Sequence, residues 1–197
     1  MRNFYIKMGV GYALDLIVLT ALGVDQFDCV FPTRTARFGH ALLIDGLVID
    51  VKSGEYQHDL RPIEKDCFCQ CCLNYTRAGI CDFKQVPDKQ SYVLSGLHLL
   101  FRSNQSAAAS ILSIHNLAHQ KRLMSSMRGA IVADQFPQWI QNYIEKNYGK
   151  ERNLPQWAAN ALGTVGVPVG KFVGDHMKDK VEKSSRHDIK SAKAISE

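Results

Sequence analysis

The sequence predicts an α/β fold, and three features of its N-terminal part support this. Residues 4–8 form a β-type run that Gly9 closes, and residues 12–22 place apolar side chains at helical spacing before Gly23. A second apolar run, residues 27–31, follows directly. A strand, a helix and a strand with short connections are typical of a parallel sheet. A doubly wound sheet and a barrel are both compatible with this order.

The composition is that of a globular protein with one sizeable core. Of the 197 residues, 46% are hydrophobic and 22% are charged, so global disorder is not expected. The net charge of +5 is compatible with a polyanionic partner without requiring one. No apolar run reaches the roughly 18 residues of a membrane span. A signal peptide is not expected, because Asp15 interrupts the N-terminal apolar stretch.

A hairpin is expected next, over residues 41–51. Asp45 and Gly46 lie between two runs of apolar and β-branched residues, and this dipeptide favours a type I′ turn. The segment 41–66 is therefore expected to lead from the α/β part to a group of cysteines.

The C-terminal part is predicted to be helical. Apolar residues at mostly three- and four-residue steps predict a long helix over 106–131 and a second helix over 135–148. A short third helix is expected over 157–162. Pro168 marks a boundary, and the charged segment 169–197 lacks periodicity, so a disordered tail is expected there.

The cysteine spacing indicates a metal site. Four of the six cysteines fall within residues 67–72 of a chain without a secretory signal, which favours a metal over disulfides. Cys67, Cys69 and Cys72 have C-x-C-x2-C spacing, and three thiolates need one more nitrogen or sulfur ligand to complete a structural zinc site. The spacing leaves the fourth ligand open. The candidates are Cys71, Cys81, His98, His115 and His119.

Charged residues surround the apolar run 27–31. Asp28 lies within the run and Asp25 just before it, whereas Arg34 and Arg37 follow it. Charges beside an apolar strand are costly unless they are paired or used, so these residues are candidates for function. The alternative is a strand end whose charges are simply solvated.

The longer string over residues 27–39, FDCVFPTRTARFG, closely resembles the active-site strand and anticodon-reading loop of the tRNA-guanine transglycosylases. In eukaryotes these enzymes are the queuine tRNA-ribosyltransferases. Residues 8–13 resemble the base-pocket segment of that family, and residues 67–72 resemble its zinc motif. Three motifs in the family's order, within roughly residues 4–165, make this resemblance specific.

The resemblance implies a (β/α)8 TIM barrel in which residues 1–40 supply the last two βα units. It also implies a zinc-binding subdomain over 67–134 and C-terminal helices over 135–168. Chemistry in such barrels lies at the C-terminal ends of the strands, so Gly9 and Asp28 are expected to meet there.

The resemblance further implies a reaction with Asp28 as its nucleophile. A carboxylate that attacks C1′ of a nucleoside forms a covalent intermediate, as in retaining glycosidases. Queuine would then replace guanine at the wobble position of tRNAs with GUN anticodons. The implied base-binding residues are Met8 and Gly9. The implied RNA-binding residues are Gly9, Val10, Gly11, Tyr12, Ala13, Leu14, Asp15, Thr33, Arg34, Thr35, Ala36 and Arg37.

For the metal, the resemblance implies a structural Zn2+ and names His115 as the fourth ligand beside Cys67, Cys69 and Cys72. His119, one turn later, is the runner-up. Between Cys72 and His115 lie 42 residues, more than the family usually has.

The segment 79–95 accounts for the excess, and we interpret it as an insertion that loops out. Cys81, which lies within it, would then not be a ligand.

The resemblance implies tRNA and queuine or guanine as partners, and a heterodimer with a related subunit that lacks the catalytic pattern. It implies a cytoplasmic location, with peripheral association at the mitochondrial outer membrane. The family enzymes are longer, and their second catalytic aspartate and most base-recognition residues have no counterpart here. We therefore expect a C-terminal portion that is inactive alone.

Three hypotheses on function remain after these observations. The first is a catalytic subunit, represented by its C-terminal part. The second is a non-catalytic, zinc-stabilised module that binds tRNA or a partner subunit, and the third is an unrelated zinc-binding RNA protein. The intact strings at 27–29 and 33–37 favour the first.

Overall fold

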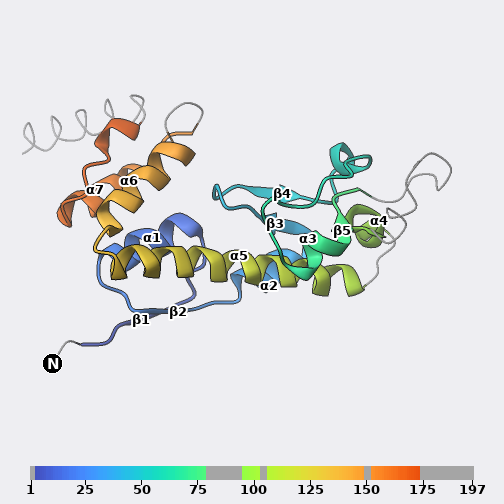
Figure 1. Cartoon of the computed structure of the whole chain (residues 1–197), viewed down its shortest axis with the longest axis horizontal. Helices are drawn as coiled ribbons and strands as arrows, with labels where there is room; N and C mark the ends of the chain where they lie inside the picture. The colour runs from blue at the N-terminus through green and yellow to red at the C-terminus, as the bar shows by residue number, and fades with distance from the viewer. Residues whose placement is uncertain (1–2, 79–94, 103–105, 149–151, 174–197) are drawn as a thin grey trace, which may run out of the picture.

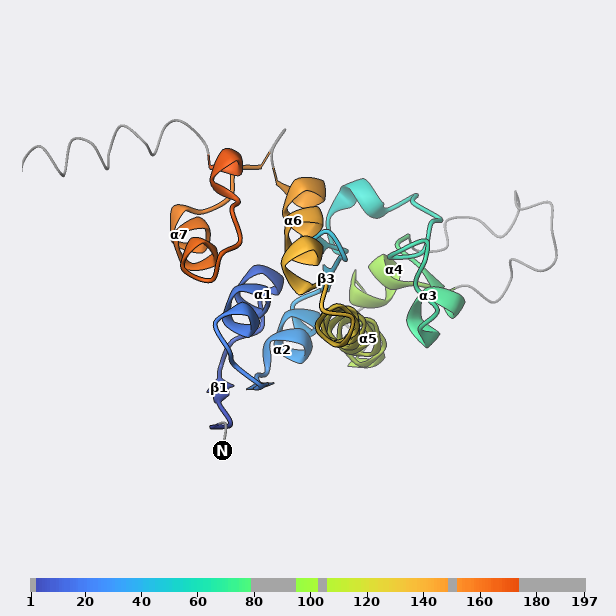
Figure 2. The same ribbon diagram turned by 60° about the vertical axis from the view of Figure 1, so that its left-hand side comes forward.

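One long helix, α5 (Ser106–Val132), runs through the centre of the fold. The computed structural model describes residues 3–78, 95–102, 106–148 and 152–173. Helices α1, α2, α3, α4 and α6 and strand β3 all contact α5 (Figure 1). Figure 2 views α5 nearly along its axis, with α1 and α2 on one side and α3 and α4 on the other. The prediction of a long helix over 106–131 is confirmed.

The N-terminal strand, helix and strand form as predicted. Strand β1 (Ile6–Met8) and strand β2 (Gln26–Asp28) pair in parallel, and helix α1 (Ala13–Ala21) connects them. Gly23 follows α1 with a φ of 100°, and its N–H donates to the carbonyl of Thr20. Glycine adopts this left-handed conformation without steric cost, which ends the helix.

The prediction that the second strand extends to residue 31 is wrong. Strand β2 ends at Asp28, and residues Phe31–Arg37 form helix α2. Pro32 lies in the first turn of α2, where proline fits because its missing N–H would have no helical partner there. The Arg34 N–H donates to the carbonyl of Val30 and closes this turn. The expected anticodon-reading loop is therefore largely helical.

The hairpin also forms, but its turn differs from the prediction. Strand β3 (His40–Leu42) pairs antiparallel with β4 (Val48–Asp50). The Leu43 N–H donates to the carbonyl of Leu47, so three residues make the connection. Gly46 has a φ of 74°, whereas Asp45 does not have a positive φ, as a type I′ turn would require. The turn is a three-residue type with glycine in the left-handed position.

Short elements surround the cysteines. They are the 3-10 turn η1 (Gly54–Tyr56), helix α3 (Gln70–Asn74), strand β5 (Tyr75–Thr76), strand β6 (Ser95–Gly96) and helix α4 (Leu97–Arg102). Strands β5 and β6 pair in parallel. The expected insertion, 79–95, lies outside the described residues except for Ser95.

Two helices follow α5, as predicted. Helix α6 (Phe136–Asn147) agrees with the predicted 135–148, and helix α7 (Gln156–Thr164) is longer than the predicted 157–162. Gly163 lies inside α7 and does not end it. The helix ends instead before Gly166, which has a φ of 76°.

Two hydrophobic cores lie along α5. The first joins α1, the second half of α5, α6 and α7, and the second joins α2, β3, α3 and the first half of α5. Val169 and Val173 belong to the first core, and residues Gly170–Phe172 form the 3-10 turn η3 between them. Order therefore extends beyond Pro168, and the expected tail does not begin at 169. Residues 174–197 lie outside the described part of the chain.

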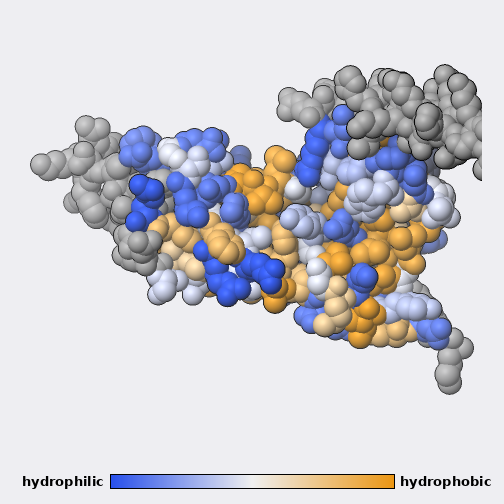
Figure 3. Space-filling view, turned by 180° about the vertical axis from the view of Figure 1, so that it is seen from behind, coloured by the Kyte–Doolittle hydropathy of each residue, from blue (hydrophilic) through white to orange (hydrophobic). Residues whose placement is uncertain are grey.

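The described strands form three separate two-stranded sheets. In the β1–β2 pair every residue except Phe27 is exposed. Figure 3 shows hydrophobic side chains gathered around this N-terminal end of the molecule. The described residues contain a parallel βαβ unit, and a closed (β/α)8 barrel is not formed within them.

Candidate metal centre and catalytic strand

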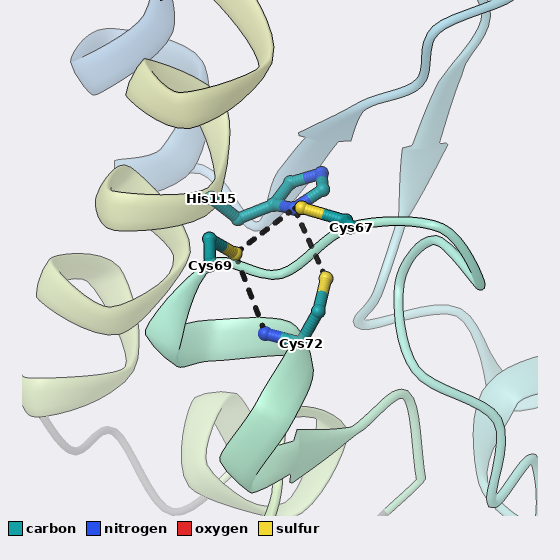
Figure 4. A group of neighbouring side chains, drawn as sticks. All are labelled: Cys67, Cys69, Cys72 and His115. Atoms are coloured by element: carbon teal, nitrogen blue, oxygen red, sulfur yellow. Dashed lines mark hydrogen bonds between the residues drawn. The ribbon is translucent and has the colours of Figure 1, made fainter. Parts of the chain in front are cut away.

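Four side chains converge on one point between α3 and α5 (Figure 4). The Nδ1 atom of His115 lies 3.8 Å from Sγ of Cys67, 3.7 Å from Sγ of Cys69 and 3.3 Å from Sγ of Cys72. All four ligand atoms lie within 4.8 Å of one another. In tetrahedral zinc sites, bond lengths of about 2.3 Å to sulfur and 2.0 Å to nitrogen separate the ligand atoms by about 3.5–3.8 Å. The four residues therefore fit Zn2+.

The second ring nitrogen of His115 sets the orientation of this ligand. The Nε2 atom lies 2.8 Å from the carbonyl oxygen of Leu42, to which it can only donate. Nε2 therefore carries a proton, and Nδ1 is the ring nitrogen that faces the thiols. Figure 4 shows the ring held in this way between β3 and the cysteines. A metal-binding histidine usually donates the N–H of its other ring nitrogen to an acceptor, and the Leu42 carbonyl is that acceptor here.

The structure decides among the candidates for the fourth ligand that it describes. His119 is 2% exposed, but it does not join the group of potential ligands, and its Nδ1 has no hydrogen-bond partner among the described residues. Cys71 is fully buried in the second core and also stays outside the group. Cys81 and the side chain of His98 lie outside the described residues. His115 is thus the fourth member of the group, as the family resemblance implies.

Local structure places the cysteines. Cys69 caps the N-terminus of α3, and its sulfur accepts a hydrogen bond from the Cys72 N–H. One turn of helix thus brings Cys72 beside Cys69. The Cys67 N–H donates to the carbonyl of Glu64, which turns Cys67 toward α5.

The pKa values of the cluster indicate which protons a metal ion must displace. Burial raises the pKa of Cys67 to about 12. Burial also acts to raise the pKa of Cys69, but hydrogen bonds from His115 and from the Cys72 N–H outweigh it and lower this pKa to about 6. For His115, burial favours the neutral ring, yet its hydrogen bonds with Cys69 and Cys72 raise the pKa to about 9. Metal binding at neutral pH must therefore release protons from Cys67 and His115.

The strand ends bring Gly9 and Asp28 together, which confirms the prediction that they meet. Met8 is the register partner of Asp28, and the Gly9 N–H donates to the carbonyl of Asp28 over 2.7 Å. Gly9 has a φ of 78°, a conformation that a residue with a side chain rarely adopts. Met8 and Asp28 are exposed. Asp25 has a different role, because its carboxylate accepts a hydrogen bond from the Tyr5 N–H.

The residues of α2 divide between solvent and core. Arg34 and Arg37 are exposed. Thr35 donates its hydroxyl to the carbonyl of Phe31, and Thr33 donates its hydroxyl to the carbonyl of Val30, so both hydroxyls bond to the helix itself. Ala36 is fully buried. The two arginines are therefore the side chains of α2 that are free to reach a polyanion.

The segment between β1 and α1 is packed tightly against the residues that follow β2. A Cβ atom on Gly11 would lie 2.5 Å from Cβ of Phe31 and 2.8 Å from Sγ of Cys29. Tyr12 is 60% exposed, and its ring lies 4.3 Å from the ring of Phe31. Residue 11 must therefore be glycine for these two segments to approach so closely.

The remaining predicted RNA-binding residues lie at the start of α1. Leu14 belongs to the first core, against which Val10 and Ala13 are partly buried. Asp15 is half-buried, and burial raises its pKa. These side chains thus pack in or against the interior of the protein.

Sequence reasoning missed two polar side chains of α5, Asn116 and Gln120. Asn116 is fully buried among α2, β3 and α5. Gln120 donates to the carbonyl of Gly11 over 2.6 Å. No local pattern marked either amide, because the burial of Asn116 and the partners of both side chains exist only in the folded chain.

Comparison with known sequences agrees with this geometry. The family model described as queuine tRNA-ribosyltransferase matches residues 3–94 and 81–149. The chain belongs to the queuine tRNA-ribosyltransferase family. The two matched ranges overlap inside the segment 79–95 that was interpreted as an insertion, of which the structure describes Ser95 alone.

Curated relatives of the family cover most of this chain. The queuine tRNA-ribosyltransferase catalytic subunit of Schizosaccharomyces pombe is 40% identical over 161 residues, which is 81% of this chain and 37% of that protein. The catalytic subunit of Caenorhabditis elegans is 36% identical over 81% of this chain and 38% of its own length. The queuine tRNA-ribosyltransferase of Deinococcus radiodurans is 39% identical over 79% of this chain and 34% of its own length.

The chain thus spans little more than a third of the length of these curated relatives. Within the part of the chain that the structure describes, no helix combines the length and apolar character needed to cross a membrane.

Proposed function

We propose that this chain carries the nucleophile strand of a tRNA-guanine transglycosylase that exchanges guanine for queuine at wobble position 34 of tRNAs with GUN anticodons. The observation that carries the proposal is the junction of Gly9 and Asp28 at the ends of two parallel strands, in a chain that belongs to this family. Parallel strands that end at one edge place their functional groups there.

The proposed reaction has two displacements at C1′ of the nucleotide. A carboxylate oxygen of Asp28 forms a bond to C1′, the bond from C1′ to guanine breaks, and guanine takes the bonding electron pair and needs a proton. The incoming base then gives up a proton, attacks C1′ and releases Asp28. Both proton transfers need an acid/base group, and we assign none in this chain.

The surroundings of Asp28 support this role. Its carboxylate is exposed at the end of β2, so it can approach a bound nucleotide. Gly9 leaves space beside it for close approach of the base, and Met8 lies at the same strand end. Arg34 and Arg37 lie on the following helix and can contact phosphates of the anticodon loop.

The metal has a structural part in this proposal. Zn2+ held by Cys67, Cys69, Cys72 and His115 would cross-link the cysteine segment to α5. All four positions are filled by protein groups, which leaves no position for a substrate.

The assembly follows the same proposal. The strands of β1 and β2 would be the last two of a (β/α)8 barrel whose other strands are supplied by sequence beyond this chain. The partner would be a related accessory subunit, and the complex would act in the cytoplasm and at the mitochondrial outer membrane.

A chimera tests the proposed activity. The matching segment of the Schizosaccharomyces pombe catalytic subunit is replaced by this chain, without residues 79–95, and labelled guanine is offered with a tRNA that has a GUA anticodon. Incorporation of label into the tRNA is expected, and it should require Asp28. A folded chimera that binds tRNA without any incorporation would favour the non-catalytic, zinc-stabilised binding module instead.

A further inference from the structure

Asn116 is a fully buried asparagine whose side chain meets three other segments. Its Oδ1 accepts a hydrogen bond from the Leu42 N–H over 3.0 Å. Its Nδ2 lies 2.9 Å from the carbonyl oxygen of Pro32 and 3.0 Å from that of His40, and also within 3.2 Å of the Thr35 hydroxyl. The amide thus bonds α5 to both ends of the stretch from α2 to β3. A buried amide whose donors and acceptor are all hydrogen-bonded typically fixes one arrangement of the segments that it joins.

The neighbouring residue, His115, which is the candidate metal ligand, bonds to the same residue of β3 as Asn116 does. His115 donates from Nε2 to the Leu42 carbonyl, while Asn116 accepts from the Leu42 N–H. Two consecutive residues of α5 therefore hold both backbone groups of one residue. The position of the metal centre and the position of α2 are linked through this pair.

Gln120 makes a similar contact one turn further along α5. Its Nε2 donates to the carbonyl of Gly11 over 2.6 Å, and its Oε1 is buried with no hydrogen-bond partner in the part of the chain that the structure describes. Gly11 lies two residues after Gly9 and packs against Phe31 and Cys29. The hydrogen bond from Gln120 to the Gly11 carbonyl therefore constrains the segment that lies beside Asp28.

We propose that Asn116 and Gln120 are positioning residues for the two halves of the candidate active site, an inference that rests on the proposed function. Asn116 holds α2, which carries Arg34 and Arg37. Gln120 holds the turn from Gly9 to Gly11. Both act from α5, one and five residues after its metal ligand.

The two effects are separable because the contacts are separate. Loss of the amide donors of Asn116 leaves the carbonyls of Pro32 and His40 without this partner in a buried place. Loss of the Gln120 donor frees only the Gly11 carbonyl. The first core, formed by α1, α6 and α7 with the second half of α5, does not include Asn116 or Gln120. Each substitution should therefore loosen one segment and leave the rest of the fold in place.

Hydrogen exchange on the 197-residue chain loaded with Zn2+ tests the positioning itself. Asn116→Asp keeps the acceptor and removes the donors, and Gln120→Glu does the same at its position. Asn116→Asp should speed amide exchange over 31–42 by roughly tenfold and leave 9–13 unchanged. Gln120→Glu should give the reverse pattern. Zinc content should stay the same in both.

Matched controls make the same chemical change on exposed helix positions. Asn160→Asp on α7 and Gln138→Glu on α6 should alter exchange in neither segment. If Asn116→Asp does not fold, Asn116→Ser carries the same expectation. Faster exchange in both segments for either variant, or in neither, would overturn the proposal.

Binding measurements on the chimera then connect position to function. Asn116→Asp should raise the Kd for a tRNA with a GUA anticodon by roughly tenfold while the KM for guanine stays the same. Gln120→Glu should raise the KM for guanine while the Kd for tRNA stays the same. If each variant speeds exchange in its own segment alone but the Kd for tRNA and the KM for guanine do not change, the positioning is supported and the proposed function is contradicted. Faster exchange in both segments, or in neither, would contradict the positioning whatever the activity.

Discussion

At the scale of single residues, the metal centre depends on which histidine nitrogen is free. His115 and His119 are one turn apart on α5, and both are buried. His115 has the Leu42 carbonyl behind its ring, and that carbonyl leaves Nδ1 to face the three sulfurs. Burial lowers the pKa of His119 to about 4, which keeps this ring neutral without making it a ligand.

Zinc binding gives the first prediction. The purified chain should contain about one Zn2+ per molecule, because four ligands are already in place. Cys69→Ser should lose the metal, and Cys81→Ser should retain it, as measured by metal analysis after dialysis. His115→Ala should lose the metal, and His119→Ala is the matched control one turn away. Retention in His115→Ala with loss in His119→Ala would reverse our choice of ligand.

The two aspartates near β2 give the second prediction. Asp25 bonds to the Tyr5 N–H, whereas Asp28 lies at the strand end beside Gly9. In the chimera, Asp28→Ala should abolish both guanine incorporation and the trapped protein–tRNA adduct, because the covalent route needs this carboxylate. Asp25→Ala should leave an adduct that a denaturing gel detects. An adduct that survives in Asp28→Ala would exclude Asp28 as the nucleophile.

At the scale of elements, close approach of two segments limits what residue 11 can be. The Gly11 site has no space for a Cβ atom, whereas Gly129, inside α5, has nothing within 4 Å of that position. The two glycines therefore have opposite effects: packing requires glycine at position 11, whereas Gly129 weakens the helix that contains it.

A pair of glycine substitutions tests this difference. Gly11→Ala should destabilise the chain by about 1–3 kcal/mol, because Phe31 or Cys29 must move. Gly129→Ala should stabilise it by about 0.5–1 kcal/mol, because alanine favours the helix. Urea unfolding of both variants measures the two changes. Equal destabilisation by both would show that packing at Gly11 is not the cause.

The segment before the cysteines is held by a carboxylate. Asp59 pairs with Arg61 at 2.8 Å and with Arg77 at 3.3 Å, and Arg77 also donates to the carbonyls of Pro62 and Ile63. These contacts join residues 59–63 to 77–78 around the metal motif. The hydrogen bond from the Arg61 side chain is the main reason why the pKa of Asp59 falls to about 2.

This shift predicts how stability changes with pH. A carboxyl with a lowered pKa in the folded state stabilises the fold above its unfolded pKa of about 4, and this contribution is lost as the pH falls toward about 2. The chain should therefore unfold at a higher urea concentration than Asp59→Asn at neutral pH. The difference should shrink as the pH falls through that window. A difference that does not depend on pH would exclude the ion pair as its source.

At the scale of the whole molecule, the N-terminal sheet has apolar residues facing solvent. Ile6 and Met8 of β1 are 55% and 64% exposed, and Phe4 just before it is 66% exposed. Parallel sheets are normally covered on both faces. This surface is where the proposed barrel would continue.

The last prediction concerns the chain by itself. The 197-residue protein should show neither guanine incorporation nor a tRNA adduct, because the acid/base group and a covered sheet are both missing from the described residues. Labelled guanine and a tRNA with a GUA anticodon, incubated with the zinc-loaded chain, provide the measurement. Measurable exchange by this chain would refute the need for further sequence.

The sequence alone determined the features that depend on neighbours along the chain. The three-cysteine spacing named three ligands, helical periodicity located α5 and α6, and the barrel implied by the family resemblance predicted that Gly9 meets Asp28. The periodicity of α5 did not decide between His115 and His119, which occupy one face, and only the family resemblance named His115.

Tertiary structure decided what depends on distant partners. Pro32 could end a strand or begin a helix, and the packing of α2 on α5 and the bonds of Asn116 to Pro32 and Thr35 favour the helix. The choice of His115, and the roles of Asn116 and Gln120, depend on backbone groups of Leu42 and Gly11 that lie 73 to 109 positions away in the sequence. No local pattern encodes such a partner, because the hydrogen bond exists only after the chain has folded.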